Sequence, residues 1–154
     1  MTMSVAGIPA HPLIVHLTVV AVPVAALLLL VWAVAPRLRG RLATLTVVVA
    51  AVGAAATLGA KFTGEALLEA QGFSEHNPGP VADHAGWADF LTVAVFVMLA
   101  VAAGYWFFSR RPATGSVIMV AIRVLAAAVA VAALVTVIGT GHEGAALVWA
   151  NNGS

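Results

Sequence analysis

Cysteine is absent from the 154 residues, which excludes thiolate metal ligands, disulfide bonds and covalent haem attachment through Cys-x-x-Cys-His. Charged residues are also scarce, at 8% of the chain, whereas 62% of the residues are hydrophobic. An ordinary soluble domain carries about 25% charged residues. The composition therefore excludes such a domain and indicates an integral membrane protein.

Four apolar segments are each long enough to cross a bilayer as a helix, which takes about 20 residues. We expect these helices over residues 13–35, 42–71, 87–108 and 117–138. The short connections after the first and third segments predict antiparallel neighbours, and so an all-α, up-down bundle of four transmembrane helices. The sequence indicates a single membrane domain over residues 1–154, without an internal repeat or a soluble domain.

The first apolar segment resembles a secretory signal peptide, because Ala33-Val34-Ala35 imitates a cleavage site. A signal peptide carries positive charge before its apolar core, and residues 1–12 contain no Lys or Arg. We therefore expect a retained transmembrane helix. Pro12 suits the first position of that helix, which would put His11 at the N-cap.

Basic residues gather at one end of the expected bundle. Six arginines lie in or beside the first and third connections: Arg37, Arg39, Arg41, Arg110, Arg111 and Arg123. Because positively charged loops stay in the cytoplasm, both chain termini are predicted to be extracytoplasmic. The predicted location is the bacterial cytoplasmic membrane, crossed several times.

The opposite, outer end is predicted to hold all the histidines and all six acidic residues. The histidines are His11, His16, His76, His84 and His142. The acidic residues lie at this end simply because the basic residues occupy the other. This explains less well why four separate segments each bring a histidine to the same level of the bundle. A histidine that enters a bilayer costs free energy unless it is paired, hydrated or bound to a ligand. The pattern therefore favours a shared histidine site.

A b-type haem is the cofactor that this histidine content favours, because imidazole is a common axial ligand of haem iron. We expect His16 and His84 to be the axial pair, with His142 and His11 as the next candidates. Trp87, one turn after His84, could pack on the bound ring.

Two neighbouring segments carry further expectations. The glycine-rich residues 139–144 around His142 predict a flexible turn that ends the fourth helix and could fold a ligand back over the bundle. Lys61 could pair with a haem propionate, although an ion pair with Glu65, one helical turn away, is the simpler role.

A bare copper, zinc or iron ion is the alternative cofactor. Its expected ligands are drawn from His11, His16, His84 and His142, with Glu143 or Asp83. Three or four histidines at one point would favour an ion, whereas two facing across a flat gap would favour haem. A third hypothesis is a structural subunit without a cofactor, whose histidines only form hydrogen bonds. The motifs of di-iron carboxylate bundles, zinc peptidases and serine hydrolases are absent.

A motif at the start of the chain points to a known family. This motif, Gly7-Ile8-Pro9-Ala10-His11-Pro12-Leu13-Ile14-Val15-His16, is similar to the Gly-x-Pro-x-His-Pro-x-x-Val-His of the DUF2231 family of bacterial membrane proteins, and the resemblance covers nearly the whole chain. Thr63-Gly64, His84-Ala85-Gly86-Trp87 and the residues 141–149 are similar to its other signatures. Members typically continue with Phe-Pro, where this chain has Leu17-Thr18.

The resemblance implies a redox setting, because relatives occur beside cytochrome c-like or Rieske-like modules. It selects His11, His16, His84 and His142, and it passes over His76. We therefore predict a protein that binds b-type haem near the outer face for electron transfer or redox sensing, rather than an enzyme. Its expected partners are the lipid bilayer and either a redox protein or a second copy of the chain, and we expect no nucleic-acid partner.

Overall fold

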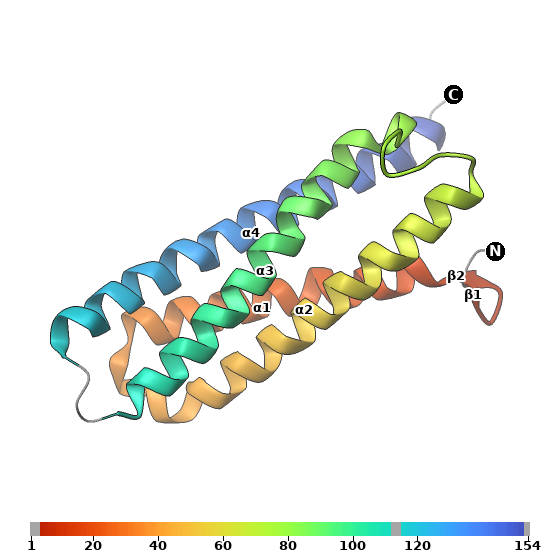
Figure 1. Ribbon diagram of the computed structural model, residues 1–154. Coiled ribbons are helices and arrows are strands. Elements are labelled where there is room, and N and C mark those ends of the chain that lie inside the picture. Colours follow the sequence, from red (N-terminus) through yellow and green to blue (C-terminus); the bar gives the residue numbers. More distant parts are fainter. Residues whose placement is uncertain (1–3, 112–114, 153–154) are drawn as a thin grey trace.

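The computed structural model describes residues 4–111 and 115–152, and within these residues the chain forms four long helices (Figure 1). They are α1 (Ala10–Val34), α2 (Arg39–Ala70), α3 (Ala82–Ser109) and α4 (Ser116–Asn152). Each is long and apolar enough to cross a membrane. The predicted all-α bundle of four transmembrane helices is confirmed.

Consecutive helices run antiparallel side by side, and α4 closes the ring by packing against α1 (Figure 1). In this arrangement α1 and α3 lie diagonally across the bundle. A short antiparallel strand pair, β1 (Ser4–Val5) and β2 (Ile8–Pro9), leads into α1. Helices α1 and α3 begin, and α2 and α4 end, at one end of the bundle, which we call the histidine end.

The core of the bundle combines many alanines with a few large side chains. Trp32, Tyr105, Leu29 and Met98 are fully buried. Many valines and leucines of the helices are exposed on the outer surface of the bundle, as expected where lipid rather than water surrounds the helices. Hydroxyls of buried threonines donate to carbonyls of their own helix, as Thr57 does to Gly53 at 2.8 Å, so the core keeps few polar groups for contacts between helices.

The helix ends differ from the prediction in three places that affect the histidines. One of them is the start of α3 at Ala82 instead of residue 87, which puts His84 inside the helix. Helix α1 begins at Ala10, so Pro9 rather than His11 is the N-cap, and Pro12 lies in the first turn, where a missing N–H removes no hydrogen bond. The predicted flexible turn over residues 139–144 is wrong, because α4 continues through it to Asn152. By contrast, the end of the second helix, expected at residue 71, agrees with the end of α2 at Ala70.

Candidate functional site

His11 and His84 lie next to each other at the histidine end. His11 is the second residue of α1 and His84 the third residue of α3, so the diagonal placement of these helices brings the two rings together across the bundle axis. The ring centroids are 6.5 Å apart and the ring planes are nearly perpendicular, at 88°. Both side chains are half-buried. We call these two residues the histidine pair.

Each imidazole of the pair is fixed by a hydrogen bond to the backbone of the neighbouring helix. Nδ1 of His11 lies 2.9 Å from the carbonyl oxygen of Ala60 on α2, and Nδ1 of His84 lies 3.0 Å from that of Thr140 on α4. Because a carbonyl oxygen can only accept, Nδ1 carries the proton and donates in both rings. In the neutral imidazole Nε2 therefore keeps its lone pair, and this is the form that ligates a metal.

A glycine one turn further along the partner helix makes room for each ring. A Cβ atom added to Gly64 would lie 3.0 Å from Cε1 of His11, and one added to Gly144 would lie 3.1 Å from Cε1 of His84. Such distances are shorter than the separation of about 3.5–4.0 Å at which carbon atoms pack best. The two imidazoles therefore occupy space that any side chain at these positions would take.

The two helix hairpins repeat this arrangement almost residue for residue. In the first, Ile14 lies one turn after His11 and approaches Gly59, the residue before Ala60. In the second, Trp87 lies one turn after His84 and packs on Gly139, the residue before Thr140. Each hairpin thus supplies one histidine, one carbonyl acceptor and two glycines, so the histidine pair lies between two equivalent half-sites.

The sequence carries the same repeat. His-x₈-Val-Ala-Val-x-Val occurs from His11 to Val24 and again from His84 to Val97, while Gly-x₄-Gly-x-Ala-Leu occurs from Gly59 and again from Gly139. The prediction that the chain lacks an internal repeat is therefore wrong. Few positions are identical between the two halves, because most are small or apolar residues that can replace one another. The repeat is therefore recognised only when the matching contacts show which residues of the two halves correspond.

The other end of the bundle has an equivalent pair on the same helices. Trp32 and Tyr105 are separated by 73 residues, as are His11 and His84, and their rings stack with centroids 4.1 Å apart. The Tyr105 hydroxyl donates to the carbonyl oxygen of Trp32 at 3.3 Å. This stacked pair joins α1 to α3 in the core and holds the two hairpins in register.

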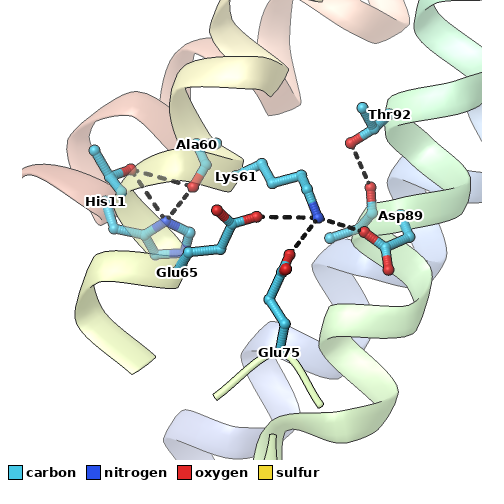
Figure 2. A network of polar contacts seen from close by, with 9 residues as sticks. His11, Ala60, Lys61, Glu65, Glu75, Asp89 and Thr92 are labelled. Atoms are coloured by element: carbon cyan, nitrogen blue, oxygen red, sulfur yellow. Dashed lines mark hydrogen bonds and ion pairs between the residues drawn. The ribbon is translucent and has the colours of Figure 1, made fainter. Parts of the chain in front are cut away.

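Lys61, which directly follows Ala60, is the centre of an ionic cluster beside the His11 half-site. Its Nζ lies 3.1 Å from Oε1 of Glu65, 3.1 Å from Oε1 of Glu75 and 2.7 Å from Oδ1 of Asp89 (Figure 2). The predicted pairing with Glu65 is confirmed, and two carboxylates from the 71–81 connection and from α3 join it. The Lys61 ammonium holds the pKa of Glu75 below its ordinary value. We call these four residues the Lys61 cluster.

The family model of DUF2231, described as a predicted membrane protein, matches residues 7–153. The chain belongs to the DUF2231 family. No curated protein and no solved structure matches it. The family description agrees with the four membrane-spanning helices, and the residues that first suggested the family include both members of the histidine pair.

The remaining histidines of this DUF2231 chain do not join the pair. His16 is exposed, and its Nδ1 lies 2.6 Å from the carbonyl oxygen of Pro12 in its own helix. His142 is exposed on α4, and His76 is exposed in the connection between α2 and α3. The structure therefore brings His11, and not His16, beside His84.

The other predicted ligands are also apart from one another. Asp83 is exposed and Glu143 is half-buried, and within the described ranges no three His, Asp or Glu side chains form a group that could hold a metal ion. Trp87 is half-buried between α3 and α4, where its ring lies against Gly139, and its ring centroid lies 6.4 Å from that of Phe90, with the ring planes at 70°. Its contacts with Gly139 join the two helices of its own hairpin.

Proposed function

We propose that this DUF2231 protein binds one b-type haem through His11 and His84 and uses it for electron transfer or redox sensing. The observation that carries the proposal is the pair of half-buried imidazoles whose Nδ1 atoms both donate to backbone carbonyls. Axial histidines of haem and metal proteins typically have such a second hydrogen bond, which fixes the tautomer and the orientation of the ring.

The spacing of the pair suits a single iron atom between two imidazoles. A metal–imidazole bond of about 2.0–2.1 Å on each side would separate the ring centroids by about 6–6.5 Å. The observed separation is 6.5 Å.

The number of ligands favours haem over a bare ion. A structural zinc ion takes four protein ligands and a catalytic one takes three, whereas the described residues bring only two imidazoles together. A haem supplies four nitrogen ligands of its own and needs one or two from the protein. Within this proposal, haem would supply reversible one-electron chemistry, and the His11 and His84 imidazoles would hold it.

Lys61 has no part in holding the cofactor in this proposal. Three carboxylates already surround its ammonium group, so a propionate would compete with ligands that are fixed within 3.1 Å. His11, His84, Gly64 and Gly144 are the residues that would contact the cofactor or the ring of an axial ligand.

We also propose that the haem lies near the extracytoplasmic face of the bacterial cytoplasmic membrane. The arginines of the first and third connections lie at the end opposite the histidine pair, and the positive-inside rule assigns that end to the cytoplasm. An electron carrier at the outer face would exchange electrons with a redox protein, or with a second copy of this chain.

The proposal is tested by replacing single histidines in the full chain and measuring haem retained after purification in detergent. We expect His11→Ala and His84→Ala each to abolish six-coordinate low-spin haem. His16→Ala and His142→Ala serve as matched controls and should retain it, because neither residue reaches the pair. Equal haem content in all four variants would favour the structural hypothesis, in which the histidines only form hydrogen bonds.

A further inference from the structure

The Lys61 cluster carries unbalanced charge beside the proposed haem site. One ammonium group faces three carboxylates, so the cluster holds more negative than positive charge. Its position is fixed by the same stretch of α2 that binds His11. Lys61 follows Ala60, whose carbonyl accepts from His11 (Figure 2), and Glu65 follows Gly64, where an added Cβ would meet the His11 ring. Asp89 lies on α3, the helix of His84.

The cluster belongs to only one of the two half-sites. The repeat that equates Ala60 with Thr140 and Gly64 with Gly144 also equates Lys61 with Gly141 and Glu65 with Ala145. The second half-site therefore fixes its histidine with an uncharged glycine and alanine at these positions. Since the same histidine contacts form without them, the charges of the cluster are not needed to build the site.

We infer that the Lys61 cluster sets the redox potential of the haem held by His11 and His84. This inference rests on the proposed function. Ferric haem carries one more positive charge than ferrous haem, so excess negative charge nearby stabilises the oxidised form and lowers the potential. Removing a carboxylate of the cluster raises the potential, and removing the Lys61 ammonium lowers it.

The expected size of the effect follows from Coulomb's law. At an effective dielectric constant of about 20, a unit charge removed at a separation of about 10 Å from a redox centre would change its ratio of oxidised to reduced forms by roughly tenfold at a fixed electrode potential. Glu75 and Asp89 are more exposed than Lys61 and Glu65, at 57% and 65% against 28% and 29%. Salt therefore screens the two exposed carboxylates more strongly, and their effects shrink as ionic strength rises.

The test is a spectroelectrochemical titration of the haem-loaded full chain in detergent at low ionic strength, with the electron supplied by the electrode. Glu75→Gln and Asp89→Asn should raise the midpoint potential, and Lys61→Gln should lower it. Lys61→Arg, which keeps the charge, should restore the wild-type value. Glu69→Gln is the control, because Glu69 is exposed on the same helix outside the cluster and should change the potential less.

Opposite signs for the lysine and carboxylate variants separate an electrostatic role from a structural one, since loosening the site would shift all of them in one direction. Unchanged potentials in haem-loaded variants, or an equal change in Glu69→Gln, would overturn the inference and leave the proposed function standing. A wild-type chain that holds no haem would overturn both.

Discussion

Replacing Gly64 by alanine tests whether the space beside His11 is essential for the site. The new Cβ would lie 3.0 Å from Cε1 and 3.2 Å from Nδ1 of His11. At this distance the imidazole must retreat by a few tenths of an ångström to reach ordinary contact. That retreat would lengthen the 2.9 Å hydrogen bond from Nδ1 to the Ala60 carbonyl to about the upper limit of the usual range, roughly 3.2 Å.

The structure predicts different effects on the stability of the fold and on haem affinity in this variant. Alanine favours a helix over glycine by about 0.8–1.0 kcal/mol, which offsets part of the strain in the fold. The hydrogen bond orients the imidazole that would bind the haem, so weakening it should reduce the free energy of haem binding by about 0.5–1.5 kcal/mol. Since 1.4 kcal/mol corresponds to about a tenfold change in affinity, haem should bind up to about tenfold more weakly while the melting temperature changes little.

The assay is titration of haem-free protein with haemin, followed through the Soret band, together with thermal unfolding. Gly141→Ala is the matched control, because nothing lies within 4 Å of a Cβ at that position. The control should gain helix stability and keep wild-type affinity. Wild-type affinity in Gly64→Ala, or an equal loss in Gly141→Ala, would refute the reasoning.

Two further predictions concern the loop between α2 and α3 and the orientation of the chain. The Lys61 ammonium lowers the pKa of Glu75 from its ordinary 4.5, so their ion pair stabilises the fold above pH 4.5 and loses this effect as the pH falls through the lower folded-state value. Glu75→Gln should therefore remove part of the acid dependence of the melting temperature, and superimposable profiles would contradict this. In the cysteine-free chain, Gly40→Cys should resist an impermeant thiol reagent added outside intact cells, whereas Ser74→Cys should react. The reverse labelling pattern would overturn the proposed topology.

The sequence was sufficient to predict the bundle, because length and hydropathy decide which segments can cross a membrane. It was a poor guide to which side of α1 faces inward. Residues all round that helix are apolar, since lipid replaces water outside the bundle, so the usual division into apolar and polar sides is missing. His11 shares its side with the buried Thr18, Ala25 and Trp32, at intervals of seven residues, whereas His16 lies elsewhere on the helix. That row of residues was a signal in the sequence for choosing His11.

The end of α4 was predicted wrongly for a different reason. Glycines at 139, 141 and 144 lower intrinsic helix propensity and are typical of a helix end. In the folded chain Gly139 and Gly144 accommodate the rings of Trp87 and His84, and these contacts with α3 hold the helix together past the glycines. Local propensity was outweighed by packing between helices that are distant in sequence.

An absorption spectrum of the detergent-purified wild-type chain, as isolated and after dithionite, shows whether His11 and His84 hold a haem. We expect a Soret band and, on reduction, the sharp α and β bands of six-coordinate low-spin b-type haem, at one haem per chain. Elemental analysis of the same sample should find iron in that ratio. A spectrum without these bands, both as isolated and after reconstitution with haemin, would contradict the account.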